Sequence, residues 1–353
     1  MPESLEPELD TPRPDEQLPL SRLTSFLREH LPTTDGEPEV LQFPGGRANL
    51  TYLIRFGDAE YVLRRPPLGP VAPSAHDMQR EYRVLSRLYA HFDLAPRSYL
   101  YCDDEGLIGA PFQVMERRRG LVIREQVPPP FDDNARLNER IGHMMVDALA
   151  DLHRVDRQQA GLVGLGHPEG FVERQLTGWE KRWHAAVESP QARMNDLIRW
   201  LQEHRVESRH VSLIHNDYKL DNILVEAHDP GTVVAILDWD MCTSGDPLTD
   251  LGYLLNQWCE ADDPPEWIEA AAMPTNATGF ATREQAVERY AARTGFDVTH
   301  IDWYYAFSCM KFAVIIQQIY IRYLRGQTQD QRFANFNERV RQYIDKGLSI
   351  VGQ

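Results

Sequence analysis

Polar residues suited to phosphoryl transfer stand between two apolar runs in the segment IHNDYKLDNILV, residues 214–225. This segment carries Asp217, Lys219 and Asn222, and Asp238 follows a later apolar run in ILDWD. Transfer from a nucleotide requires a carboxylate to orient and deprotonate the attacking hydroxyl, oxygen ligands for Mg²⁺, and cations on the phosphate. The pattern therefore predicts a catalytic loop that apolar flanks hold at both ends.

The segment HNDYKLDN, followed by ILDWD and SGDPLTDLGYLL, resembles the aminoglycoside phosphotransferase (APH) family, which has a protein-kinase-like fold. Within that family it looks most similar to the kinase-like domains associated with acyl-CoA dehydrogenases. The resemblance covers about residues 38–330. It implies that Asp217 is the catalytic base or positions the hydroxyl, and that Lys219 lies near the γ-phosphate. It also implies that Asn222 and Asp238 bind Mg²⁺.

Other residues near this loop have less specific patterns. A lone His-x-Asp pair is common in loops without catalytic function, so His215 matters only within the ordered combination, where it would brace the loop. Because Asn222 takes the ligand position, Asp221 is expected to be solvated or to accept a local turn hydrogen bond. Asp246 and Asp250 resemble the helix-start pair of the family, although Asp246 also fits a plain helix cap before a proline.

The strand YVLR carries the phosphate-binding part of the resemblance. Arg64 matches a lysine that holds the α- and β-phosphates in kinase folds and pairs with a helix glutamate, here Glu81. Arginine keeps the charge but differs from lysine in size and hydration. Arg65 is the alternative if the register of the strand shifts by one residue. Met115, in PFQVME, would receive the adenine through nearby backbone groups, but the same segment fits an inner strand.

The segment GGRANLT resembles the glycine loop of the family, with Gly45, Gly46 and Asn49 as candidate nucleotide-binding residues. Ala48 stands where the family usually has serine, so backbone N–H groups or Arg47 would have to bind the phosphate. The segment lacks the full G-x-G-x-x-G motif, and only its place before YVLR gives it weight.

Hydrophobic periodicity predicts the elements that position these residues. The N-terminal part is predicted to contain helices at 16–31 and 76–92 and strands within 40–56 and at 60–66, 98–102 and 111–116. Further helices are predicted at 134–156, 171–187, 192–205, 248–258, 282–294, 300–325 and 331–349.

With the resemblance, this order predicts an α+β, two-lobed protein-kinase-like fold that has a small β-rich lobe and a larger helical lobe. An acidic, proline-rich tail would cover residues 1–18, and the N-terminal nucleotide-binding lobe residues 19–116. The C-terminal catalytic and substrate-binding lobe would cover residues 117–353.

Composition excludes several classes of function. The 353 residues include 37 Lys and Arg against 53 Asp and Glu, and the net charge of −16 has the wrong sign for a nucleic-acid partner. Four widely separated cysteines predict neither a zinc site nor a disulfide framework. Residues 303–321 contain Lys311 and predict a buried helix rather than a membrane span. Without a visible secretory signal, a cytoplasmic location is expected, and the oligomeric state stays open.

The segment after Asp238 indicates which kind of acceptor takes the phosphate. A GDP sequence and a helix come soon after that residue, which leaves no room for the long segment with which protein kinases dock a polypeptide. We therefore expect transfer from ATP, or GTP, with Mg²⁺ to a hydroxyl of a small molecule, and a hydroxyacyl-type metabolite is the first hypothesis. The alternatives are an aminoglycoside kinase and a nucleotide-binding pseudokinase or scaffold. The acidic stretch NQWCEADDPPEW, within 256–280, fits a solvated loop or a substrate lid.

Overall fold

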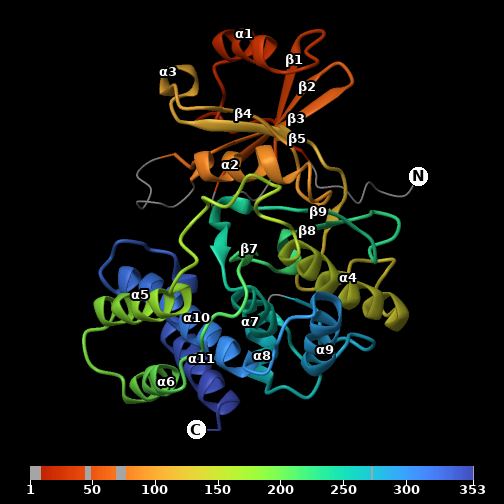
Figure 1. Cartoon of the computed structure of the whole chain (residues 1–353). Helices are drawn as coiled ribbons and strands as arrows, with labels where there is room; N and C mark the ends of the chain where they lie inside the picture. Colours follow the sequence, from red (N-terminus) through yellow and green to blue (C-terminus); the bar gives the residue numbers. More distant parts are fainter. Residues whose placement is uncertain (1–8, 44–48, 69–76, 272, 353) are drawn as a thin grey trace. The chain divides into compact units, whose positions relative to one another are not determined.

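The computed structural model describes residues 9–43, 49–68, 77–271 and 273–352 (Figure 1). The described chain forms two compact units, each assembled from several stretches of sequence. Unit 1 contains the described residues up to Val122 together with Asp156–Val163 and Asn222–Cys242. Unit 2 contains Ile123–Val155, Gly164–Asp221 and the described residues from Thr243 onward. These units interleave along the chain and are a different division from the predicted lobes, whose boundaries stay a prediction.

A five-stranded antiparallel sheet in the order β1-β2-β3-β5-β4 forms the centre of unit 1. Its strands are β1 (Pro38–Gln42), β2 (Leu50–Phe56), β3 (Ala59–Arg65), β4 (Ser98–Cys102) and β5 (Phe112–Glu116). One face packs against α1 (Leu20–His30), and α2 (Met78–Leu88) packs on β4 and β5. Figure 1 shows these two helices on opposite faces of the sheet, so alternate strand residues face different helices.

A smaller sheet completes unit 1. It has the order β6-β8-β9, from β6 (Leu121–Val122), β8 (Ile223–Val225) and β9 (Val233–Ile236), and η2 (Trp239–Met241) follows it. The short helix α3 (Glu105–Ile108) lies between β4 and β5 in sequence. The chain leaves unit 2 within η1 (Leu220–Asn222), which leads from the Asp217 loop directly into β8.

Unit 2 is mostly helical, with the short pair β7 (Ser212–Ile214) and β10 (Thr243–Gly245). Its helices are α4 (Ala135–His153), α5 (Phe171–Ala186), α6 (Ala192–Glu203), α7 (Leu248–Gln257), α8 (Pro265–Ala270), α9 (Arg283–Thr294), α10 (Ile301–Leu324) and α11 (Phe336–Ile350), with η3 (Gln331–Phe333) before the last. Helix α10 packs against α5, α6, α7 and α11 and is the centre of this unit. Gly252 lets α7 approach α10 closely, since a Cβ there would lie 2.6 Å from the backbone of Tyr304.

The predicted elements agree with the structure except at some boundaries. Helix α1 begins at Leu20 rather than 16, because Pro19 cannot donate a helical hydrogen bond. Helix α11 begins at Phe336 rather than 331, after the turn of η3. The helices α3 and α8 are too short to show a period and were not predicted. No helix in the described ranges is long and apolar enough to cross a membrane.

Candidate active site

The loop that carries Asp217 and Lys219 lies between β7 and η1 in unit 2, and its backbone is held by α7. Asp250 accepts hydrogen bonds from the N–H of His215, at 2.5 Å, and of Asn216, at 2.8 Å. Asn216 has a φ of 67°, a left-handed conformation that asparagine adopts at lower cost than most residues. The Asp217 N–H lies 3.3 Å from Nδ1 of His215. The loop therefore has a fixed backbone.

Asp250 is fully buried, and its partners explain why it can stay charged. Burial opposes ionisation, but the hydrogen bond and charge of His153, together with His215, outweigh burial and hold the pKa of Asp250 below its ordinary value. Nε2 of His153 lies 3.3 Å from Asp250, and Nδ1 lies 2.6 Å from the hydroxyl of Tyr290. Asp246, just before the N-cap Pro247 of α7, accepts from the N–H of Leu248 at 3.0 Å and from the hydroxyl of Tyr304 at 2.7 Å.

The carboxylate of Asp217 is partly exposed and contacts a cation and a hydroxyl. Its side chain is 27 % exposed, and Nζ of Lys219 lies 3.4 Å from Oδ2. The hydroxyl of Tyr253, on α7, donates to Oδ1. Burial raises the pKa of Tyr253 well above its ordinary value, and the charge of Asp217 adds to the shift, so the hydroxyl keeps its proton and donates. Sequence spacing offers no signal for Tyr253, because it reaches Asp217 only through the fold.

A second group of predicted residues meets in unit 1. Arg64 of β3 forms ion pairs with Glu81 of α2 and, at 2.7 Å, with Oδ1 of Asp238. The expected pair between Arg64 and Glu81 is therefore present. Burial raises the pKa of Glu81 to about 7, although the charge of Arg64 opposes that shift. Asp238 has a φ of 66°, and Asn216, the other non-glycine residue with positive φ near the site in the described chain, directly precedes the predicted Asp217.

Gln113 of β5 extends this buried polar group and was not predicted. It faces Arg64 in the register between β3 and β5, and its side chain donates to Oε2 of Glu81. Oγ of Ser98 donates in turn to Gln113 at 3.1 Å. The N–H of Trp239 donates to Oε1 of Glu81 at 3.3 Å. Each oxygen of the buried Glu81 carboxylate therefore has a donor, which a buried carboxylate requires.

Asn222 and Asp238 are brought together by the hairpin of β8 and β9. The N–H of Leu237 donates to the backbone oxygen of Asn222 at 2.8 Å, so Asp238 directly follows a residue that is bonded to Asn222. The amide oxygen of asparagine and the carboxylate of aspartate are oxygen ligands of the kind that Mg²⁺ prefers. Mg²⁺ usually has few protein ligands and completes its coordination with phosphate and water. In the described ranges no group of three or more His, Cys, Asp or Glu side chains could form an all-protein cage. The pair fits Mg²⁺ held jointly with a nucleotide.

The remaining candidates have varied environments. Met115 is buried in β5 between β3 and β4. Asn49 is buried directly before β2, whereas Gly45 and Gly46 lie outside the described residues. Arg65 points to the face opposite Arg64 and donates to the backbone oxygen of Ile108 at 2.7 Å, so the register places Arg64 beside Glu81.

Asp221 differs from its expected environment. One carboxylate oxygen, Oδ1, is buried and has no hydrogen-bond partner among the described residues, and Asp221 as a whole is only partly exposed. Burial raises the pKa of Asp221 above its ordinary value, and Lys219 opposes the shift. The solvated or turn-capping role predicted for Asp221 is therefore wrong for this oxygen, because η1 turns it inward.

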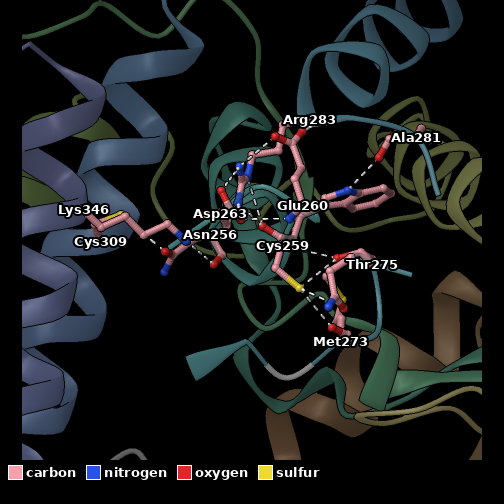
Figure 2. A network of polar contacts seen from close by, with 12 residues as sticks. Asn256, Cys259, Glu260, Asp263, Met273, Thr275, Ala281, Arg283, Cys309 and Lys346 are labelled. Carbon is pink, nitrogen blue, oxygen red and sulfur yellow. Dashed lines mark hydrogen bonds and ion pairs between the residues drawn. The ribbon is translucent and has the colours of Figure 1, made fainter. Parts of the chain in front are cut away.

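The acidic stretch after α7 is tied to α9 (Figure 2). The guanidinium of Arg283 pairs with Asp263 and, at 3.2 Å, with Glu260. Arg283 also donates to the backbone oxygen of Trp258, at 2.7 Å from Nη2. Two of the acidic side chains are therefore neutralised by a partner within unit 2, while Asp262 and Glu266 are at least partly exposed. The stretch is not simply a solvated acidic loop.

Comparison with known proteins adds to this geometry. The model of the phosphotransferase enzyme family (APH) matches residues 39–291. Mouse acyl-CoA dehydrogenase family member 10 is 32% identical over 312 residues, which cover 88% of this chain and 29% of the mouse protein. The chain spans less than half the length of the curated relatives it matches.

Solved structures show the same fold. A Ralstonia eutropha protein, provisionally named an aminoglycoside phosphotransferase, is 28% identical with a TM-score of 0.82, and the match covers 95% of this chain and 98% of that protein. The GDP and kanamycin complex of APH(2")-IIIa is 16% identical with a TM-score of 0.63, over 92% of this chain and 98% of that one. These matches confirm the α+β protein-kinase-like fold predicted from the sequence.

Proposed function

The chain belongs to the phosphotransferase enzyme family, and from that membership we propose that it is a small-molecule kinase. It would transfer the γ-phosphate of ATP, with Mg²⁺, to a hydroxyl of its acceptor. The observation that carries this proposal is the Asp217 loop. Asp250 fixes its backbone, and the partly exposed carboxylate of Asp217 already accepts a hydrogen bond from a hydroxyl, that of Tyr253.

Asp217 would act on the acceptor as a general base. Its carboxylate takes the proton of the acceptor hydroxyl while that oxygen forms a bond to the γ-phosphorus, and the bond from phosphorus to the bridging oxygen of ADP breaks. Lys219, 3.4 Å from Asp217, would place a positive charge near the transferring phosphate. Fixed groups of this kind act by positioning and by electrostatic stabilisation, which supply most of the catalysis in phosphoryl transfer.

The residues of unit 1 would bind the nucleotide. Arg64, oriented by Glu81, has the charge and the planar donors to bind the α- and β-phosphates. Asn222 and Asp238 would hold Mg²⁺, which supplies positive charge to the phosphate oxygens when bound. Because Arg64 contacts Asp238 directly, it also offsets the charge of that carboxylate before a nucleotide binds. The backbone near Met115 would receive the adenine, and Gly45, Gly46 and Asn49 remain proposed as nucleotide-binding residues, of which the two glycines lie outside the described residues.

A hydroxyacyl-type metabolite is the proposed acceptor, on the basis of similarity to acyl-CoA dehydrogenase family members. The aminoglycoside alternative would need an acidic surface that attracts a polycation. Arg283 neutralises Glu260 and Asp263 in the most acidic stretch of the helical part, so these side chains do not favour that alternative. A scaffold would need no Mg²⁺ ligands, and a nucleotide-binding pseudokinase would not need Asp217 as a base beside the ligands Asn222 and Asp238, so the presence of all three argues for turnover.

A screen for phosphoryl transfer tests the proposal. The protein would be incubated with Mg-ATP, and in parallel with Mg-GTP, and a panel of hydroxyacyl compounds, amino alcohols and aminoglycosides, with mass spectrometry to detect a gain of one phosphoryl group. The matched control is Asp238→Asn, which keeps the side-chain size but removes the charge proposed for Mg²⁺ binding. Product formation that is equal in the variant, or nucleotide binding without any product or hydrolysis, would contradict the proposal.

A further inference from the structure

A buried lysine on α10 lies beside the Asp217 loop. Lys311 is 7% exposed, and Nζ lies 3.5 Å from the backbone oxygen of Asn216. The ammonium stands over two aromatic rings, 5.6 Å from the centroid of Trp179 and 5.3 Å from that of Tyr253. Such contacts stabilise a cation but replace only part of its hydration. Lys311 is thus held in place without a strong partner.

Among the residues that the structure describes, Lys311 has no direct counterion. Within the described ranges no Asp or Glu oxygen lies within 4.0 Å of Nζ, although lysine is almost never buried unless paired. Burial lowers the pKa of Lys311 below its ordinary value. The charges of Asp250 and Asp217 oppose that shift, and Arg182 adds to it. A buried charge that is not paired is costly, and a bound anion would offset the cost.

The contacts of Lys311 connect it to the proposed acceptor site. Tyr253 contributes its ring to Lys311 and its hydroxyl to the carboxylate of Asp217. Asn216, whose oxygen faces Lys311, is the residue directly before Asp217. One tyrosine side chain and one peptide therefore separate the ammonium from the carboxylate proposed as the base. An acceptor whose hydroxyl reaches Asp217 could place a second group near Lys311.

A second buried lysine in unit 2 has similar surroundings but a different location. Lys346 is 4% exposed, and it lies 5.0 Å from the ring centroid of Trp267 and 5.4 Å from that of Tyr305. Its Nζ donates to the backbone oxygen of Asn256 at 3.0 Å, a contact visible in Figure 2. This hydrogen bond joins α11 to α7 and does not involve the Asp217 loop. Lys346 therefore provides a matched control for the loss of a buried lysine.

We propose that Lys311 binds an anionic oxygen of the acceptor, so that the acceptor is an alcohol that also carries a carboxylate or a phosphate group. The inference rests on the proposed function and narrows its substrate class. An ammonium at this position attracts an anion and repels an amino sugar, so the same residue disfavours a polycationic acceptor. A carboxylate and a phosphate could each bind the ammonium of Lys311 through an anionic oxygen. The probes are chosen to show which of the two groups binds.

Binding measurements with four small alcohols test the proposal. The probes are 3-hydroxybutyrate, its neutral methyl ester, the cationic 4-amino-2-butanol, and 3-hydroxybutyl phosphate, which carries a phosphate but no carboxylate. Each is titrated calorimetrically into wild-type protein that holds Mg²⁺ and a non-hydrolysable ATP analogue. We expect an anionic probe to bind about tenfold to a hundredfold more tightly than the ester and the amine, as a charge-assisted hydrogen bond would give. Preference for the hydroxy acid identifies a carboxylate, and preference for the hydroxybutyl phosphate identifies a phosphate.

Variants locate the effect at Lys311. The preference for anionic probes should fall by about tenfold or more in Lys311→Met. Part of this preference should remain in Lys311→Arg, because arginine keeps the positive charge. The preference in Lys346→Met should equal that of wild type. The absence of anion preference in wild type, its survival in Lys311→Met, or an equal loss in Lys346→Met would overturn the proposal.

Nucleotide affinity separates this inference from the proposed function. Lys311→Met should bind the ATP analogue as wild type does, because the described contacts of Lys311 all lie in unit 2. A loss of nucleotide affinity in this variant would show that Lys311 only supports the loop, and it would contradict the inference alone. Failure of wild type to bind any nucleotide with Mg²⁺ would instead contradict the proposed function.

Discussion

The side chain of Asp217 has an environment suited to proton transfer, because a hydroxyl and an ammonium already contact its two oxygens. We predict that Asp217→Asn binds Mg-ATP almost as wild type does but transfers phosphate about 10² to 10⁴ times more slowly, the usual contribution of a positioned general base. Single-turnover transfer to the acceptor from the screen, or slow ATP hydrolysis in its absence, provides the measurement. Wild-type rates in Asp217→Asn would show that the loop is not catalytic.

Arg64 and Arg65 are neighbours in β3 but face opposite sides of the sheet, so their substitution should have different effects. Arg64→Ala removes a guanidinium beside Glu81 and Asp238, and we predict a loss of ATP affinity of about 1.5–3 kcal/mol, or roughly tenfold to a hundredfold. Arg65→Ala removes a buried hydrogen bond to Ile108 and should lower stability while leaving affinity unchanged. Calorimetric ATP titration and thermal denaturation of both variants distinguish these outcomes, and the reverse ranking would refute the assigned register.

Helices α7 and α10 provide a prediction at the level of elements, because α7 carries Asp250 and Tyr253 and α10 carries Lys311. A methyl group at Gly252 would meet the Tyr304 backbone at 2.6 Å, so Gly252→Ala should force the helices apart and cost about 1–3 kcal/mol of stability. The rate of phosphoryl transfer should also fall, because Asp250 and Tyr253, which hold the Asp217 loop, would move with α7. Thermal denaturation and the transfer rate provide the two measurements.

The control for this helix contact is another glycine within a helix. Gly178 of α5 has open space around it, because a methyl group added there would meet no described atom within 4 Å other than those of its chain neighbours and of the nearby backbone of its own helix. Alanine at this position should raise helix stability by up to about 1 kcal/mol. Equal midpoints of thermal denaturation for Gly252→Ala and Gly178→Ala would indicate that α7 and α10 are not closely packed at Gly252.

At the scale of the whole molecule, nucleotide binding should stabilise the protein only when the metal is present. Mg-ATP at about one hundred times its Kd should add about 2.7 kcal/mol to the free energy of unfolding and raise the melting temperature. Removal of Mg²⁺ with EDTA, or the substitution Asp238→Asn, should abolish most of that shift. EDTA removes the metal, and the substitution removes the charge of one proposed ligand. A shift of the same size without the metal would argue against Asn222 and Asp238 as its ligands.

The sequence by itself determined the family, most elements and the candidate residues with local patterns. Strand β4 has the predicted bounds of residues 98–102, since alternation over a few residues depends only on local side chains. The segment HNDYKLDN was sufficient to predict Asp217, Lys219 and Asn222 as site residues, because a short rigid loop fixes their spacing. The pairing of Arg64 with Glu81 was likewise predicted, as a strand and a helix that resemble those of kinase folds carry them.

Only the tertiary structure decided which distant residues meet these candidates. Gln113 reaches Glu81 through the register of β3 and β5, and Tyr253 reaches Asp217 through the position of α7. In the sequence, Lys311 indicated only that its helix does not span a membrane. The packing of α10 places its side chain beside the Asp217 loop. Local periodicity carries no information on such contacts, because they depend on how elements far apart in the chain pack. The same reason explains the unpredicted burial of Asp221 and the neutralisation of Asp263 by Arg283.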